Sequence, residues 1–547
     1  MKRILFIVIA LFSVLHIAAQ DMGADYFAVG EFDAARKIFE SRNDNPAETN
    51  YYLGEIARLQ GDPAGAKNYY ARGKAADPQY PLNEIGLLRL SFSCDKEAAA
   101  DALNDLVKAK QNKKNPLVLT VAATVFYDNG MPSEGDEMLE RAETADRNSV
   151  LPHMVRGDRF FRENDPGAAA GQYEQALMKN PDYPVTYIRI AQIYMRNNPE
   201  IAIERLKELE TRHPDYPLTQ KYLAKSYFRT GQYKQAIALY EKMFTVPGQE
   251  TDLDAVTGYA ASLFFTEAYD RAAALIQQGL SISPDDFVLN RLRMYCDLAQ
   301  KKYSDGLSAA SRFFALPRGD NEYIARDYIT YGDLLFNSGR PDEAVLQYDM
   351  ALKLPGVAPE TIRQIAENLF RKAPGKAAGY YRKYIDAIGE AAQATDYYTL
   401  GQTLYREAVA LSQDTVSNDA PERLTQCLNQ ADSAFTVVCD RIPESHLGPV
   451  FRARVNSLRD PEATAGLAKP FYETVLKIIL GKENPTKNRR ELVEAYRYLG
   501  YYHYVQYEAE KRPEEKTLAV DYCHKILELD PANDVATQLL AALDEQS

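Results

Sequence analysis

The stretch Tyr222-Leu-Ala-Lys-Ser-Tyr-Phe-Arg-Thr-Gly-Gln-Tyr-Lys-Gln-Ala-Ile-Ala-Leu-Tyr240 contains the pattern that decides the fold. A small residue, Ala224, is followed by a turn that contains Gly231. A second small residue, Ala236, lies twelve positions after the first, and Tyr240 lies sixteen positions after it. Apolar residues on both sides of a Gly-containing turn predict two amphipathic helices that fold back on each other.

The same spacing returns along most of the chain. Copies that begin at Gly54, Gly157, Ala260 and Gly332 keep both of these offsets. The first small residue recurs along the chain at nearly even intervals, except between Ala260 and Gly332, which are two intervals apart. This series consists of Gly157, Ala191, Ala224, Ala260, Gly332, Ala366 and Gly401. A period of about 34 residues is typical of a repeat built from a helix pair, and such pairs stack because one pair cannot bury its apolar face alone.

Helix packing explains the residue types at these positions. Antiparallel helices approach closely where their facing side chains are small, and a bulky residue one turn later on the second helix fills the space beside the crossing. A proline that follows the second helix in several copies, as at Pro78, Pro181 and Pro284, cannot continue that helix. The repeat therefore predicts its own helix ends.

These residues resemble the tetratricopeptide repeat. Its degenerate pattern matches Leu53-Gly54, Ala66, Tyr70 and Pro78. Where the family often has Trp, this chain has Tyr, with 38 Tyr and no Trp. The resemblance implies an all-α fold, a right-handed superhelical solenoid of stacked antiparallel helix pairs, with about 13–14 repeats over most of the chain.

The N-terminal segment, residues 1–19, has the features of a secretory signal. Lys2 and Arg3 precede the apolar run Ile4–Leu15, and small residues follow it. We expect cleavage after Ala19, with an uncleaved anchor as the alternative, and no transmembrane span after cleavage. The expected location is the periplasm or the cell envelope.

The repeat is regular over residues 20–390 and more decorated over residues 391–547. The polar stretches Ser412–Pro421, Gly481–Arg490 and Lys511–Lys516 delay the pattern, and Ala532–Leu543 predicts a capping helix. We place a soft boundary near residue 390. Whether the two arrays form one superhelix stays open.

Composition excludes several classes of protein. The chain has 64 basic and 77 acidic residues and a net charge of −13, which argues against nucleic acid as a partner. With 46% hydrophobic residues it is not disordered. Its five cysteines include no CxxC pair, and Cys427 and Cys439 lie twelve positions apart on one predicted helix, too far apart to form a disulfide.

No motif predicts chemistry. The six histidines form no HExxH pattern, and the sequence has no GxSxG, GxGxxG or GxxxxGK[ST] motif. Tyr501-Tyr502-His503-Tyr504 is the one cluster of titratable rings, and we interpret it as helix packing. We therefore expect no catalytic residue, no cofactor and no metal, and we expect that the protein is not an enzyme.

The resemblance implies that the first helix of each pair lines a concave groove. Four positions after the small residue the side chain is apolar or aromatic, and five positions after it an Arg often follows; Lys221 and Lys225 add charge. Packing between repeats explains the aromatic positions equally well, and a solvated face explains the basic ones. The predicted partner-binding groove consists of Tyr127, Phe161, Arg162, Met195, Arg196, Lys221, Lys225, Phe228, Arg229, Phe264, Phe336, Phe370, Arg371, Tyr405 and Arg406.

Together these patterns predict a non-catalytic scaffold that binds one or more envelope proteins through aromatic and Arg contacts in its groove. The alternative is a binding module for an envelope glycan, because Tyr-rich walls also suit sugar stacking. An enzyme is a distant third interpretation.

Overall fold

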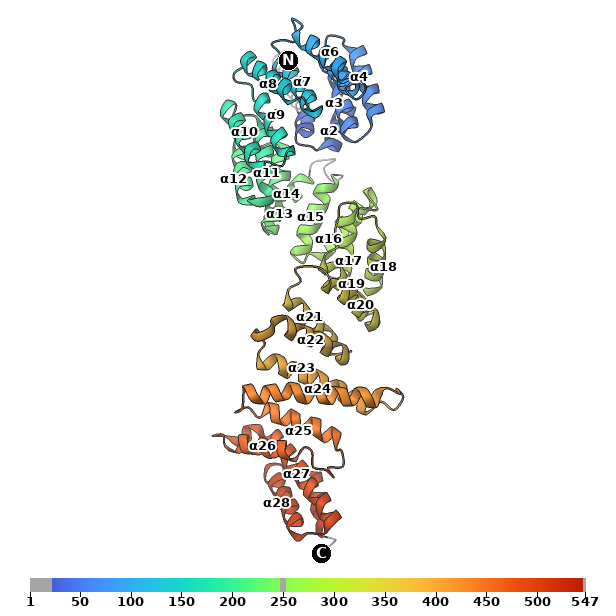
Figure 1. Cartoon of the computed structure of the whole chain (residues 1–547), viewed down its shortest axis with the longest axis vertical. Coiled ribbons are helices and arrows are strands. Elements are labelled where there is room, and N and C mark those ends of the chain that lie inside the picture. The colour runs from blue at the N-terminus through green and yellow to red at the C-terminus, as the bar shows by residue number, and fades with distance from the viewer. Residues whose placement is uncertain (1–21, 246–251, 545–547) are drawn as a thin grey trace, which may run out of the picture. The chain divides into compact units, whose positions relative to one another are not determined.

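The computed structural model describes residues 22–245 and 252–544, so the predicted signal at residues 1–19 lies outside the described residues. Within these ranges the regular elements are helices, and no residue is assigned to a strand (Figure 1). The contacts divide the chain into unit 1, Met1–Cys296, and unit 2, Asp297–Ser547. The predicted all-α array of stacked helix pairs is confirmed.

In unit 1 a short helix at residues 22–28 pairs with α2 (Phe32–Ser41). The following helices are α3 (Pro46–Leu59), α4 (Pro63–Ala76), α5 (Pro81–Ser91), α6 (Lys96–Lys108), α7 (Pro116–Asp128), α8 (Pro132–Ala145), α9 (Leu151–Arg162), α10 (Pro166–Lys179), α11 (Pro184–Asn197), α12 (Pro199–Arg212), α13 (Pro217–Arg229), α14 (Tyr233–Met243), α15 (Leu253–Phe265) and α16 (Tyr269–Ile282). The division between the units falls within α17 (Phe287–Ala299).

Unit 2 continues with the same helix pairs. They are α18 (Tyr303–Ala315), α19 (Ala325–Asn337), α20 (Pro341–Leu352), α21 (Pro359–Phe370), α22 (Pro374–Ile388), α23 (Ala394–Ser412), α24 (Ala420–Arg441), α25 (Leu447–Arg459), α26 (Lys469–Leu480), α27 (Arg489–Glu510), α28 (Pro513–Leu529) and the final α29 (Asp534–Asp544), with 3₁₀ turns η2 (Gly389–Ala391) and η3 (Pro485–Asn488). The described helices form fourteen successive pairs, and α29 is the expected capping helix.

The small residue of the first helix lies against the bulky residue of the second. A Cβ atom added to Gly54 would come within 2.4 Å of the Tyr70 ring, and the same ring lies against Gly86 of the next pair. Gly157 and Tyr173 repeat this contact at 2.4 Å. The Tyr ring therefore fits only because glycine has no side chain at the helix crossing. This explains why the glycine and the tyrosine recur at a fixed offset from each other.

The extra residues of the C-terminal array lengthen its helices. The polar stretch Ser412–Pro421, expected as an insertion, spans only a short connection, because α23 has 19 residues and α24 has 22. α27 also has 22 residues, and α28 begins at Pro513. Part of the excess therefore extends the helices, whereas residues 481–488 form a connection between α26 and α27 that contains η3. The soft boundary near residue 390 remains an interpretation of the sequence.

The helices of unit 1 turn back so that the first pair meets the sixth and seventh pairs. Tyr216, just before α13, donates a hydrogen bond from its hydroxyl to Asp25 at 3.0 Å, and Gln192 on α11 donates to the carbonyl of Val29 at 2.8 Å. Tyr26 and Phe39 belong to the same apolar cluster as side chains of α9, α11 and α13. A common core therefore joins segments that are far apart in the sequence.

Candidate functional site

Two adjoining cavities lie on the inner face of this turn in unit 1. Their volumes are about 590 and 480 Å³, and both are lined by Arg58, Leu59, Asp128 and Arg162. The lining comes mainly from the helix at residues 22–28 and from α3, α5, α7, α9 and α11, the first helix of each of the first six pairs. These helices therefore form one inner wall.

A buried carboxylate organises the α3 side of this wall. Glu55 is 3% exposed and accepts hydrogen bonds from the Tyr70 hydroxyl at 2.5 Å, from Arg89 at 2.6 Å and from Arg58 at 2.8 Å. Burial alone would raise the pKa of Glu55, but the guanidinium groups of Arg89 and Arg58 outweigh burial and hold this pKa below its ordinary value. Glu55 is therefore ionised and fixes both arginines.

The same arrangement recurs along the wall. Tyr173 donates to Asp158 at 2.6 Å, and Arg189, on the next first helix, donates to the same carboxylate at 3.3 Å. Arg162 donates to Asp128 of the preceding pair at 2.6 Å. Each Arg side chain is therefore oriented by an acidic residue about one repeat earlier.

Three of these arginines keep a donor unused. The Nε–H groups of Arg58, Arg89 and Arg189 are buried and have no acceptor among the residues that the structure describes. All three residues line the smaller cavity. An unsatisfied buried donor costs free energy, so these three groups are a cost of the arrangement. The donors that a carbonyl or carboxylate in the cavity could reach belong to Arg162, whose side chain is 54% exposed and lines both cavities.

Apolar side chains are exposed at the same place. Leu59 is 47% exposed, Leu117 39% and Phe161 46%, and all three line the smaller cavity. Exposed apolar groups on a concave surface are typical of binding sites, because they lose contact with water when a ligand covers them.

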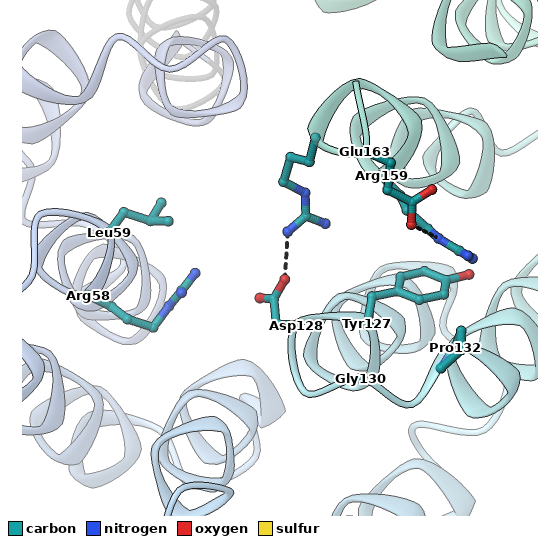
Figure 2. A pocket seen from close by; sticks show the side chains of 9 residues that line it. Arg58, Leu59, Tyr127, Asp128, Gly130, Pro132, Arg159 and Glu163 are labelled. Atoms are coloured by element: carbon teal, nitrogen blue, oxygen red, sulfur yellow. Dashed lines mark hydrogen bonds and ion pairs between the residues drawn. The ribbon is translucent and has the colours of Figure 1, made fainter. Parts of the chain in front are cut away.

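Figure 2 shows the larger cavity. Arg58 and Leu59 project from α3 into the open space and face Asp128 of α7 across it, whereas the Tyr127 ring points away from them toward Arg159. Arg159 lies over the Tyr127 ring, with the guanidinium carbon 4.6 Å from the ring centroid, and donates to Glu163 at 2.9 Å. Five charged side chains and one aromatic ring thus line this opening.

The structure brings only part of the predicted groove to these cavities. Of its residues, Tyr127, Phe161 and Arg162 line them. Met195, Lys221, Phe264 and Phe336 are buried, with exposures of 3 to 8%, and a buried side chain is not an open wall of a groove. In those repeats the fourth position after the small residue packs into the array, and Lys221 is enclosed by carboxylates.

The other predicted groove residues lie outside the two cavities. Half-buried side chains are Lys225, Phe228, Phe370 and Tyr405, and exposed ones are Arg196, Arg229, Arg371 and Arg406. In unit 2 the Arg406 guanidinium lies over the Phe370 ring at 5.1 Å. Whether these residues contact a partner stays a prediction.

Several residues of the inner wall are not among the predicted groove residues. Counting four and five positions from Gly54 gives Arg58 and Leu59, so the same count locates them once charged residues are allowed at the fourth position. Arg89 lies 34 positions after Glu55, close to one period, and the recurring acid–Arg pair was its available signal. The sequence offered no comparable signal for Leu117.

The described part of the chain adds two further findings. Within residues 22–245 and 252–544, no helix combines the length and apolarity needed to cross a membrane. In the same ranges, no group of three or more His, Cys, Asp or Glu side chains is placed to hold a metal ion.

Comparisons with known proteins find tetratricopeptide repeats. A family model described as tetratricopeptide repeat matches residues 21–81 and 189–249. Among solved structures, the C-terminal part of a TPR repeat-containing protein from Cytophaga hutchinsonii is 24% identical, with 52% of this chain and 99% of that chain covered and a TM-score of 0.36. A tetratricopeptide repeat protein from Parabacteroides merdae is 19% identical, with 46% and 98% covered and a TM-score of 0.34.

A third structure, PilW, is described as a widely conserved type IV pilus biogenesis factor. It is 16% identical, with 36% of this chain and 89% of that chain covered and a TM-score of 0.32. No curated protein matches the sequence.

Proposed function

We propose that the chain is a non-catalytic tetratricopeptide-repeat scaffold that binds an extended segment of a partner protein along the inner wall of unit 1. The match of a tetratricopeptide-repeat model to residues 21–81 and 189–249 supports this proposal. The single observation that carries this proposal is the convergence of exposed apolar side chains and oriented arginines on two adjoining cavities. Repeats of this family supply interaction surfaces, and this wall has both kinds of contact that a peptide offers.

The wall is suited to a peptide because its apolar groups can contact the side chains of the peptide and its polar groups can bind the oxygen atoms of the peptide. Leu59, Leu117 and Phe161 are suited to the apolar side chains of a segment. The Arg162 guanidinium, which is 54% exposed and lines both cavities, is suited to its carbonyl or carboxylate oxygens. Since Asp128 already holds Arg162, little freedom of that side chain is lost on binding.

We place this activity in the cell envelope. The support is the sequence of residues 1–19, with Lys2 and Arg3 before the apolar run Ile4–Leu15. Mass analysis of the natively expressed protein should find an N-terminus at or near Gln20. An intact Met1 on the cytoplasmic protein would contradict the location without touching the scaffold proposal.

The scaffold proposal is tested by native co-purification of the tagged full chain from the envelope fraction. The double variant Leu59→Ser with Phe161→Ser should weaken capture of a stoichiometric partner by about 2–4 kcal/mol, as for interface anchors. Met178→Ser is the matched control, because Met178 is 68% exposed on α10 and does not line either cavity. Equal capture by both variants would contradict the inner wall as the binding site.

The same purification tests the alternative partner. A retained envelope glycan, lost with the double variant and accompanied by no stoichiometric protein, would favour a glycan-binding module. The aromatic side chains that line the cavities, among them Tyr127 and Phe161, suit sugar stacking too, so the ligand has to be identified chemically.

A further inference from the structure

The first helix pair of unit 1, residues 22–41, makes polar contacts far along the chain. Lys221 on α13 donates from its Nζ to Glu31 at 2.7 Å, and the Tyr222 hydroxyl donates to the same carboxylate at 3.2 Å. With the Tyr216–Asp25 and Gln192–Val29 hydrogen bonds described above, four contacts span 163 to 191 sequence positions. Repeats of a solenoid ordinarily contact only their neighbours, so these contacts are additional to the stacking of the array.

Lys221 is the centre of this contact. Its side chain is 3% exposed, and its Nζ also donates to Asp252 at 2.7 Å and lies 3.5 Å from Asp254. Burial alone would lower the pKa of Lys221, but the carboxylates of Glu31 and Asp252 outweigh burial and raise this pKa. Lys221 is therefore charged, and Glu31 is one of several carboxylates that compensate it.

The contact closes the wall around the smaller cavity. Phe27, Gly30 and Phe32 of the first pair line that cavity together with Val185 and Arg189 of α11. Release of Glu31 from Lys221 would loosen the first pair at the far side of the cavity, where the Tyr216–Asp25 and Gln192–Val29 hydrogen bonds also hold it, while Lys221 kept Asp252 as a partner. Loss of the closing contact would thus leave Lys221 paired with Asp252.

We propose that residues 22–41 form a latch that closes unit 1 and controls entry to the inner-wall cavity, with Glu31 and Lys221 as its releasable contact. The control of entry rests on the proposed function, whereas the latch itself does not. The device is a two-state element: in one state the first pair is docked on α11 and α13, and in the other it is undocked and the cavity is open on that side.

The test uses the absence of Trp from the sequence. Phe27→Trp places a single indole on the cavity lining, and acrylamide quenching of its fluorescence measures how open that lining is. Glu31→Lys in this background sets two cations against each other and should raise the quenching constant about threefold or more. Glu40→Lys is the control, because Glu40 is exposed on the same helix pair and undergoes the same charge change.

Hydrogen exchange on the same samples distinguishes undocking of residues 22–41 from unfolding of unit 1. In Glu31→Lys the amides of residues 22–41 should exchange faster while those of α7 and of α19 keep their protection, which distinguishes undocking from unfolding. If Glu31→Lys loses protection throughout unit 1, Glu31→Gln in the same background gives the smaller opening. Equal quenching constants for the Glu31 and Glu40 variants, with unchanged exchange at residues 22–41, would overturn the latch.

Partner capture separates the two proposals. If Glu31→Lys opens the cavity and changes capture by the tagged full chain relative to Glu40→Lys, both the latch and its control of entry stand. If the cavity opens and capture is unchanged, the latch stands and its control of entry through this cavity is wrong.

Discussion

Glu55 in unit 1 and Asp333 in unit 2 occupy the same place in their repeats, directly after the small residue of the first helix. Each accepts a hydrogen bond from the Tyr of the second helix, Tyr70 at 2.5 Å and Tyr348 at 2.8 Å. One period later, however, Glu55 meets the guanidinium of Arg89, whereas Asp333 meets only the side-chain amide of Asn368, at 3.2 Å.

This one difference reverses the electrostatics of the position. The pKa of Glu55 is lowered, because Arg89 and Arg58 outweigh its burial, and the pKa of Asp333 is raised, because burial dominates there. The position of the carboxylate is therefore set within its own repeat, by the Tyr of the second helix. Whether the ionised or the protonated carboxyl group is favoured depends on the side chain that the next repeat places beside it. In unit 1 the ionised Glu55 holds Arg58 and Arg89 in place beside a cavity.

The largest expected effect comes from removing each charge without changing shape. Glu55→Gln leaves Arg89 and Arg58 without their shared carboxylate and should lower the free energy of unfolding by about 3–5 kcal/mol, because one member of a buried pair is lost. Asp333→Asn keeps an oxygen for Tyr348 and Asn368 and should change it by about 1 kcal/mol or less. Urea denaturation, with hydrogen exchange to assign each unit, measures both. Equal losses would show that the Arg neighbours do not matter.

The next effect tests the contact that both units share. Gly157→Ala in unit 1 and Gly332→Ala in unit 2 each place a Cβ atom 2.4 Å from a Tyr ring and should cost about 1–3 kcal/mol through overpacking. Gly171→Ala and Gly379→Ala are matched controls on exposed helix positions, because a Cβ atom there has no neighbour within 4 Å. The controls should gain about 0.5–1 kcal/mol from helix propensity. Melting temperatures that move the same way in test and control variants would contradict the packing account.

Lowering the pH should change the contributions of Glu55 and Asp333 to the free energy of unfolding in opposite directions. Glu55 stays ionised in the folded protein below its ordinary pKa of 4.5, so the unfolded chain takes up the proton first, and this stabilisation is lost as the pH falls from 4.5 through the folded pKa. Asp333 takes up its proton at a higher pH in the folded state, so acidification toward 3.8 favours folding there. The cost of Glu55→Gln should therefore shrink at low pH.

The unfolding free energies of wild type, Glu55→Gln and Asp333→Asn, compared at neutral pH and at about pH 4, measure these opposite signs. Wild type should become more stable relative to Asp333→Asn on acidification and less stable relative to Glu55→Gln. Parallel pH profiles for the two variants would contradict the assignment.

The smallest expected effect concerns helix starts. Asp165 caps α10 by accepting a hydrogen bond from the backbone N–H of Ala168 at 2.9 Å, whereas Arg340, at the start of α20 in unit 2, makes no side-chain cap. Asp165→Ala should cost about 1 kcal/mol, and Arg340→Asp should gain about 0.5–1 kcal/mol. Thermal melts of the two variants test this, and a loss in Arg340→Asp would mean that its exposed pair with Glu343 outweighs the cap.

Much of this structure follows from local spacing. The repeat period predicted the helix pairs, and the Gly and Tyr sixteen positions apart predicted the close crossing, because both depend on residues within one repeat. The closure of unit 1 depends instead on Glu31 meeting Lys221, and no local pattern relates residues 190 positions apart. The burial of Phe264 and Met195 was hidden for a related reason: an aromatic or apolar side chain at that position serves packing and binding alike.

The closure of unit 1 also determines how this part of the chain responds to force. A stack of repeats pulled at its ends extends like a spring, because the load passes through every interface in series. Here residues 22–41 are joined directly to α11 and α13, so tension between the first pair and α13 passes through Glu31 and Lys221 and bypasses the repeats between them. Those intervening repeats should carry this tension only after the joint breaks, when the load passes through their interfaces in series, so we expect unit 1 to extend in two stages.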